Sequence, residues 1–203
     1  MKWGRVSPVC MVFNPKDRFF HKAKADGFLA RSAYKLEELQ QKYKIIRSGD
    51  LILDLGAAPG SWSQVAMKII GPSGRVVGLD LKPIELSAPN AKFYVMNAFD
   101  FDPIILEGRT QIDVLLSDMA HNTTGIRSVD QARSFELCQQ ILKISDEFLK
   151  PKGNVVMKVF EGPDAEKISK EISKKFEVHN RFKPEAVRKG SYETYFVGLN
   201  KRA

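Results

Sequence analysis

The fold of this chain is decided by one stretch near residue 50: Leu51-Ile52-Leu53-Asp54-Leu55-Gly56-Ala57-Ala58-Pro59-Gly60-Ser61-Trp62-Ser63. Its first five residues are almost wholly apolar, which is typical of a strand buried in a parallel sheet. The glycines and the proline that follow predict a tight turn. An apolar pattern then predicts a helix over residues 61–70. A strand, a glycine-bearing loop and a helix in this order indicate a nucleotide-type binding loop.

The loop Gly56–Gly60 differs from the dinucleotide pattern G-x-G-x-x-G, because Ala58 replaces the middle glycine and Pro59 follows it. A proline has no backbone N–H to offer a pyrophosphate. A ligand without phosphates, such as S-adenosylmethionine, therefore fits this loop better than NAD does. Asp80 ends the next predicted strand, where a carboxylate can accept hydrogen bonds from both hydroxyls of a ribose.

Strands and helices alternate along the rest of the chain, which predicts an α/β fold with a mainly parallel, doubly wound sheet. The last two strands have no helix between them, so we expect them to pair antiparallel. The predicted strands are residues 51–55, 75–80, 92–96, 112–117, 154–160, 177–182 and 194–199. The predicted helices are residues 30–43, 61–70, 129–149 and 164–176, with a turn at 150–153 closing the third.

The chain has 203 residues, which predicts one domain, and we place it at residues 26–203 after a basic, partly irregular lead at 1–25. The net charge of +8 is unevenly spread: residues 1–49 carry +7, residues 50–178 carry −3 and residues 179–203 carry +4. A small-molecule enzyme has no need of two basic ends. A polyphosphate partner would use them, because each neutralised phosphate releases counterions. The charge pattern therefore favours nucleic-acid binding over a solvated basic tail.

Other features of the sequence exclude several classes of protein. No apolar run approaches the roughly 20 residues that span a bilayer, and basic residues and a proline interrupt the first ten positions, unlike a signal peptide. The two cysteines and three histidines lack the spacing of a metal or redox site. We therefore expect a cytoplasmic protein, monomeric, with no metal ion and no membrane.

Four short motifs, spread over most of the chain, each hold one lysine or one carboxylate: Ser32-Ala33-Tyr34-Lys35-Leu36, Ser117-Asp118-Met119-Ala120, Val156-Met157-Lys158-Val159-Phe160 and Ser191-Tyr192-Glu193-Thr194-Tyr195. Taken alone, Lys35 or Glu193 is more simply a surface salt-bridge residue. Together with the stretch 51–63, the motifs resemble, in identity, order and spacing, the FtsJ/RrmJ family of RNA ribose 2′-O-methyltransferases over about residues 17–201. That resemblance implies a seven-stranded sheet of order 3-2-1-4-5-7-6, and a catalytic tetrad of Lys35, Asp118, Lys158 and Glu193.

The resemblance also implies which residues contact S-adenosyl-L-methionine. They are Gly60, Trp62, Asp80, Asp100 and Asp118. Asp100 matches the Asp-Phe pair whose carboxylate meets the adenine amino group in the family. Relatives often have a glycine before that pair, whereas Ala98-Phe99 stands here, so the neighbouring Asp102 remains an alternative.

In the implied reaction, a methyl group passes to a ribose hydroxyl, so the protein must align the hydroxyl and handle its proton. Lys158 is the central catalytic residue in this interpretation, with Asp118 and Lys35 assisting it and Glu193 in an auxiliary role. The sequence leaves two roles open for Lys158. It either removes the proton or orients the hydroxyl and stabilises the developing oxyanion.

The N-terminal lead mixes positive charge with aromatic residues, a combination that suits RNA phosphates and unstacked bases. The candidate RNA-binding residues are Lys16, Arg18, Lys22, Lys24 and Arg31, and Arg181, Lys183, Arg188 and Lys189 extend the same surface. The resemblance implies ribosomal RNA as substrate, with a uridine of the large subunit as target. A transfer-RNA anticodon-loop methyltransferase is the nearest alternative. A non-catalytic ribosome-assembly factor and a small-molecule methyltransferase or NAD enzyme are further ones.

Overall fold

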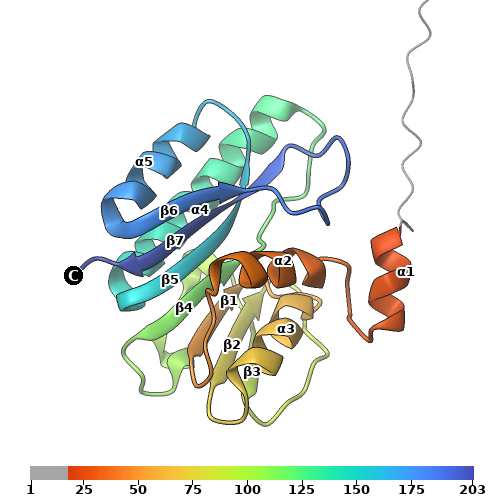
Figure 1. Cartoon of the computed structure of the whole chain (residues 1–203). Helices are drawn as coiled ribbons and strands as arrows, with labels where there is room; N and C mark the ends of the chain where they lie inside the picture. The colour runs from red at the N-terminus through yellow and green to blue at the C-terminus, as the bar shows by residue number, and fades with distance from the viewer. Residues whose placement is uncertain (1–17) are drawn as a thin grey trace, which may run out of the picture.

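The computed structural model describes residues 18–203, whose strands form one sheet in the order β3-β2-β1-β4-β5-β7-β6 (Figure 1). The strands are β1 (Leu51–Leu55), β2 (Arg75–Asp80), β3 (Ala91–Val95), β4 (Ile112–Ser117), β5 (Leu149–Phe160), β6 (Phe176–Phe182) and β7 (Glu193–Lys201). Neighbours among β1 to β5 pair parallel, whereas β7 pairs antiparallel with both β5 and β6. The predicted α/β fold, its strand order and its antiparallel ending are confirmed.

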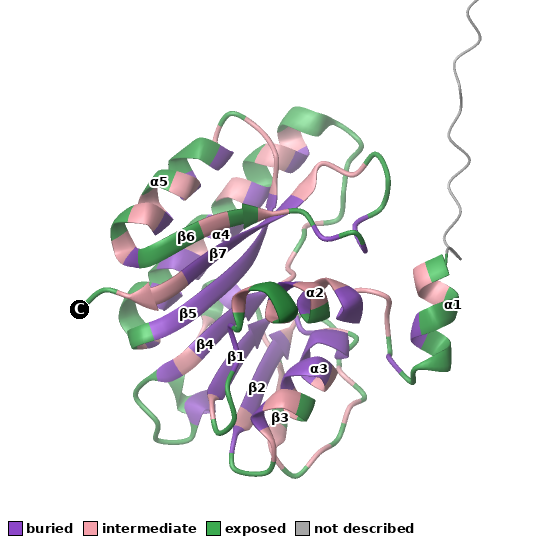
Figure 2. Cartoon of the chain, viewed as in Figure 1, coloured by how far each residue is buried: buried purple, intermediate pink, exposed green. Residues whose placement is uncertain are grey.

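Helices cover both faces of this sheet. They are α1 (Arg18–Ala25), α2 (Ala33–Tyr43), α3 (Ser61–Ile70), α4 (Arg127–Phe148) and α5 (Ala165–Lys175), with short 3₁₀ turns η1 (Ala98–Asp100) and η2 (Pro103–Leu106). Figure 2 shows the buried strands in the middle, with exposed stretches on the outer sides of the helices and in the loops. None of the described helices is both long enough and apolar enough to cross a membrane.

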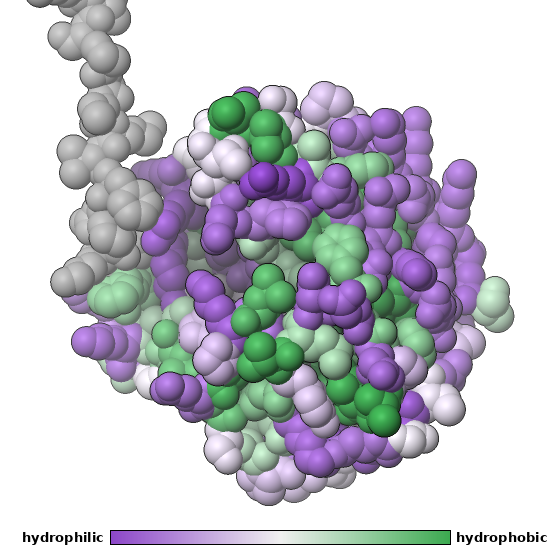
Figure 3. Space-filling view, turned by 180° about the vertical axis from the view of Figure 1, so that it is seen from behind, coloured by the Kyte–Doolittle hydropathy of each residue, from purple (hydrophilic) through white to green (hydrophobic). Residues whose placement is uncertain are grey.

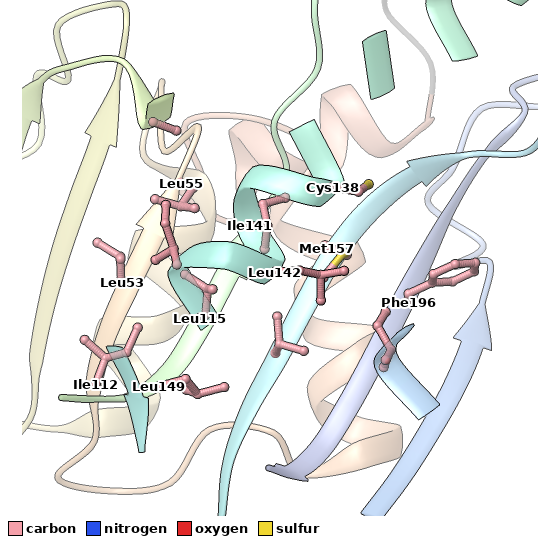
Figure 4. Packing of buried hydrophobic residues seen from close by; sticks show 14 of the residues in the cluster. Leu53, Leu55, Ile112, Leu115, Cys138, Ile141, Leu142, Leu149, Met157 and Phe196 are labelled. Carbon is pink, nitrogen blue, oxygen red and sulfur yellow. The ribbon is translucent and has the colours of Figure 1, made fainter. Parts of the chain in front are cut away.

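The core consists of two apolar clusters, one on each face of the sheet, because successive strand side chains point to opposite faces. In β5, Met157 belongs to one cluster with Leu142 of α4, and Figure 4 shows these side chains close together. The next residue toward the N-terminus, Val156, belongs to the other cluster with Leu36 of α2. Strands buried on both faces need a near-continuous apolar sequence. The apolar runs of β1, β4 and β5 could therefore be recognised as strands from the sequence.

The structure corrects two details of the predicted elements. Strand β5 begins at Leu149, directly after α4, so the turn predicted at residues 150–153 is wrong. Its register with β4 shifts between Ile112 and Val114, which lets the strand start early. Helix α2 begins at Ala33 rather than residue 30. Residues 18–25, which belong to the lead that we expected to be partly irregular, form α1.

The parallel strands bring several polar residues to one edge of the sheet. Ligands of such sheets bind beyond the carboxyl ends of the strands. At this edge Gly56 follows β1, Asp80 ends β2, Asp118 follows β4, and Lys158 lies in the last part of β5.

On the rear of the molecule, apolar and hydrophilic side chains are mixed across the surface (Figure 3).

Candidate active site

The register of the sheet directs three tetrad side chains toward the face that α2 covers. Leu116, Val156 and Tyr195 all pack in the cluster that includes α2. Asp118, Lys158 and Glu193 each lie two residues from one of these, and side chains two apart along a strand share a face. Since α2 carries Lys35, the fold gathers all four predicted residues at one point.

The contacts between the four residues form a continuous ionic chain. The ammonium nitrogen Nζ of Lys35 lies 2.5 Å from Oε1 of Glu193 and 3.9 Å from Oδ1 of Asp118. On the other side of Asp118, Nζ of Lys158 lies 3.0 Å from the same Oδ1 and also donates to the backbone carbonyl of Asp118. Asp118 therefore holds both lysines within a single site.

Tyr195 is a member of this site that the sequence analysis missed. Its hydroxyl donates to Oδ1 of Asp118 over 2.7 Å and lies 3.4 Å from Oε1 of Glu193. The Lys35 ammonium lies 5.6 Å from the centre of its ring. Burial, together with Asp118 and Glu193, raises the pKa of Tyr195 well above its ordinary value, so the hydroxyl stays protonated and donates. Tyr195 could be assigned to the site only from its antiparallel pairing with Lys158, which no local sequence motif reveals.

The electrostatic balance of the site favours an ionised Asp118. Burial acts to raise the pKa of Asp118, but Lys158, Lys35 and the hydrogen bond from Tyr195 outweigh it and hold that pKa below its usual value. A carboxylate surrounded by two ammonium groups and a hydroxyl donor is a fixed anchor. It sets the direction in which each lysine presents its remaining N–H groups.

A cavity of about 430 Å³ opens next to Asp118. Its wall includes Gly56 and Asp80 from the ends of β1 and β2, Phe99 from η1, and Asp118 and His121 after β4. Both Asp80 oxygens accept backbone N–H groups, Oδ2 from Ala58 over 3.1 Å and Oδ1 from Lys82 over 2.9 Å, which fixes the carboxylate at the rim.

The wall of this cavity suits a nucleoside ligand. Phe99 and Leu81 line the cavity although they are 47% and 70% exposed, so they offer apolar surface to a ring. The buried nitrogen Nε2 of His121 has no hydrogen-bond partner among the described residues, and a bound polar ligand would supply one. Within residues 18–203, no cluster of three His, Cys, Asp or Glu side chains could hold a metal ion.

Three of the expected cofactor contacts do not line the cavity. Gly60 precedes α3 with a φ of 113° and lies against Leu29, Ile84 and Leu86. Trp62 is buried; its indole N–H donates to the backbone carbonyl of Ser32 over 2.8 Å and its ring lies 5.7 Å from that of Tyr195. Asp100 is exposed in η1, next to the lining residue Phe99. The alternative Asp102 caps η2 by accepting the Ile104 N–H over 2.9 Å.

Asp54 in β1 and Gly56 in the loop after it support the site from beneath. Gly56 has a φ of 74°, and a Cβ on it would lie 2.6 Å from the Met119 side chain, so only glycine lets these loops meet. Asp54 is fully buried and accepts a hydrogen bond from Ser63 over 2.7 Å, while its Oδ1 has no partner among the described residues. Burial raises the pKa of Asp54 to about 7, with Asp118 and Asp80 adding to the rise and Ser63 opposing it.

Most of the expected RNA-binding residues lie near α2. Lys22 of α1 places its ammonium 4.5 Å from the ring centre of Tyr34, beside Lys35, and the Arg18 and Arg31 guanidiniums lie over the Phe19 ring. Lys24 is exposed on α1, and Lys16 lies outside the described residues. Arg181 differs from the others, because it pairs with Glu161 over 3.0 Å and Glu166 over 3.5 Å. Its guanidinium lies over the ring of Phe196, which packs in the core cluster on the other face of the sheet.

Known proteins share the sequence pattern and the fold of this chain. A Bdellovibrio bacteriovorus protein named ribosomal RNA large subunit methyltransferase E is 45% identical over 95% of this chain and 100% of its own length. A Desulfatibacillum aliphaticivorans protein of the same name is 47% identical over 92% of this chain and 91% of its own. A solved Plasmodium falciparum structure, described as a ribosomal RNA methyltransferase, matches with a TM-score of 0.74 at 27% identity, covering 86% of this chain and 98% of that one. The model of the FtsJ-like methyltransferase family matches residues 28–201, so the resemblance is confirmed, and the chain is a methyltransferase that belongs to this family.

Proposed function

We propose that this protein transfers a methyl group from S-adenosyl-L-methionine to the 2′-hydroxyl of a ribose in large-subunit ribosomal RNA, most specifically a uridine. One observation carries the proposal: Asp118 belongs both to the Lys35–Asp118–Lys158–Glu193 cluster and to the wall of the 430 Å³ cavity. Asp118, which binds both lysines, therefore also lies at the edge of the proposed cofactor site. A ribose hydroxyl at this junction meets the donor cavity on one side and the ammonium groups on the other.

The cavity residues hold the cofactor in this proposal. Asp80 would accept hydrogen bonds from the ribose hydroxyls, Phe99 and Leu81 would offer apolar surface to the adenine ring, and Asp118 would complete the wall of the site. S-adenosylmethionine, when bound, supplies a methyl group already activated on a sulfonium. Pro59 and the small residues around it leave room for a nucleoside but offer little to a pyrophosphate.

The lysines act on the hydroxyl. Lys158 has three N–H donors and uses two toward Asp118, on its carboxylate and its backbone carbonyl. The third remains for the incoming hydroxyl, where Lys158 would stabilise the negative charge that develops on oxygen as the hydroxyl proton passes to water. Lys35, held by Glu193 and Asp118, adds a second positive charge, and Tyr195 keeps Asp118 in place.

RNA approaches over α1 and α2 in this proposal. Arg18, Lys22, Lys24 and Arg31, with Lys16 before them, neutralise phosphates on the side of α2 from which Lys35 reaches the site. The enzyme works as a monomer in the cytoplasm on the large ribosomal subunit.

The proposal is tested by incubating the protein with labelled S-adenosylmethionine and three substrates: undermethylated large subunits, free large-subunit RNA and unmodified transfer RNA. We expect label in a 2′-O-methylated uridine of the large-subunit RNA. Label in a transfer-RNA anticodon loop would replace the ribosomal substrate with the nearest alternative. Tight RNA binding without any label would replace the enzyme with a non-catalytic assembly factor.

A further inference from the structure

The loop between β6 and β7 (residues 183–192, the β6–β7 loop) is held onto α2 by two side chains. Glu38 accepts the backbone N–H of Glu185 over 2.7 Å on one oxygen and that of Ala186 over 3.0 Å on the other. Arg31 donates to the backbone carbonyl of Ala186 over 2.5 Å. Both polar groups of the Ala186 backbone are therefore satisfied by side chains in or beside α2.

The rest of the loop is ordered around this attachment. The N–H of Val187 donates to the carbonyl of Pro184 over 3.0 Å, which closes a turn, and Ala186 and Val187 are buried in the core cluster. Lys183 reaches across to donate to the carbonyl of Ser191. In Figure 1 the loop extends from β6 to a position above the end of α2 that faces α1, and Figure 2 shows both buried and exposed stretches in it.

The attachment and the catalytic site use the same side of α2. Lys35 and Glu38 lie three residues apart in α2, a spacing that places side chains on one helical face. Arg31 lies in the turn just before the helix. Lys35 meets Glu193, immediately after the loop. Burial and the charge of Arg188 lower the pKa of Arg31, while Glu193 opposes that effect, so these charged groups lie within electrostatic reach of one another.

The exposed tip of the loop carries Arg188 and Lys189. Two cations on a loop that is fixed next to the catalytic site suit a chain of phosphates leading away from the target ribose. Fixing the loop beforehand avoids the entropy of ordering it when RNA binds. Resting on the proposed RNA substrate, we propose that Glu38 is a positioning residue for RNA: it holds the β6–β7 loop so that Arg188 and Lys189 contact phosphates beside the target nucleotide.

A charge-matched pair of variants tests this role. Glu38→Gln removes one negative charge and the paired carboxylate contact, whereas Glu37→Gln removes the same charge from an exposed position one residue away. Simple electrostatics predicts that loss of an acidic charge strengthens RNA binding in both variants. If Glu38 positions the loop, the two variants should differ in RNA affinity. Glu37→Gln should bind RNA as tightly as the wild type or tighter, whereas Glu38→Gln should bind RNA more weakly.

The measurement is the Kd for unmodified large-subunit ribosomal RNA as a function of salt, with cofactor affinity measured alongside. For Glu38→Gln we expect the RNA Kd to rise about tenfold, equivalent to about 1.4 kcal/mol. The slope of log Kd against log salt concentration should become smaller by about 1 to 2, because two phosphate contacts weaken. Cofactor affinity should stay unchanged, and the loss should appear in the KM for RNA rather than in the single-turnover rate at saturating RNA. Added to an Arg188→Ala/Lys189→Ala protein, Glu38→Gln should cause little further loss.

The outcomes separate the inference from the proposed function. If the wild type binds and methylates RNA but the two glutamine variants behave alike, Glu38 has no part in RNA binding, and a fall in melting temperature alone would make it merely structural. Full additivity with the Arg188→Ala/Lys189→Ala change would equally overturn the inference, because Glu38 would then act elsewhere. A wild type that binds no RNA would remove the proposed function and this inference together.

Discussion

Replacing Lys158 by alanine should nearly abolish methyl transfer while leaving the fold and the cofactor site intact. In the structure Lys158 is 9% exposed and contributes two of the contacts that Asp118 receives, at Oδ1 over 3.0 Å and at the backbone carbonyl. After its removal, Asp118 keeps the Tyr195 hydroxyl at 2.7 Å and Lys35 at 3.9 Å. The carboxylate is therefore not left without a partner.

Two magnitudes follow from these contacts. Breaking a buried ion pair costs about 3–5 kcal/mol when the remaining charge has no partner, and because Asp118 retains Tyr195 and Lys35, we expect a smaller loss of stability. The rate should fall by about 10²–10³, the usual cost of removing one donor that stabilises a developing oxyanion. Lys158→Met, which keeps the apolar stem without the ammonium group, should lose as much activity with less loss of stability.

Single-turnover rates at saturating RNA and cofactor measure the effect directly, and calorimetry with S-adenosylmethionine checks the cofactor site. A Lys35→Ala/Lys158→Ala protein should be little slower than Lys158→Ala, because residues that act as one unit are not additive. If Lys158→Ala retained more than about a tenth of the wild-type rate, it would lie outside the range expected for loss of an oxyanion-stabilising donor, and the role assigned to the tetrad would be refuted.

Three further perturbations test the cofactor site, the basic lead and the support beneath the loop. Asp80→Ala should weaken S-adenosylmethionine binding by about 1.5–3 kcal/mol, the range for hydrogen bonds to a charged group; unchanged affinity by calorimetry in a folded protein would remove Asp80 from the site. Joint replacement of Lys16, Lys22 and Lys24 by alanine should weaken RNA binding and flatten its salt dependence without changing cofactor affinity, whereas an unaltered salt slope would show that these lysines do not contact phosphates. Because the pKa of Asp54 is raised to about 7 in the folded protein, ionisation should reduce stability progressively as pH rises from about 4, the unfolded value, to about 7. Denaturation of Asp54→Asn should therefore show an advantage over the wild type that grows across this window, and a constant difference would contradict the raised pKa.

The apolar runs at residues 51–55, 112–117 and 154–160 identified central strands because a sheet covered on both faces needs nearly continuous apolar sequence. Errors arose where local chemistry was ambiguous. Lys150-Pro151-Lys152-Gly153 has the composition of a turn, yet pairing with β4 through a register shift extends β5 over it. The composition of residues 18–25 does not reveal that Phe19 and Tyr34 pack together, with ring centres 5.6 Å apart, and help to place α1 beside α2.

By itself the sequence determined the α/β class, the positions of most elements, the loop unsuited to pyrophosphate and the four charged motifs, because each is a property of neighbouring residues. Only the tertiary structure decided which side chains meet. Lys158 pairs with Tyr195 across β5 and β7, and a slip of one residue would turn either side chain to the opposite face. The positions of Tyr195, Glu38 and the buried Trp62 side chain all depend on contacts between residues at least 30 positions apart. Such contacts depend on register and helix packing, which a single sequence encodes only through the fold as a whole.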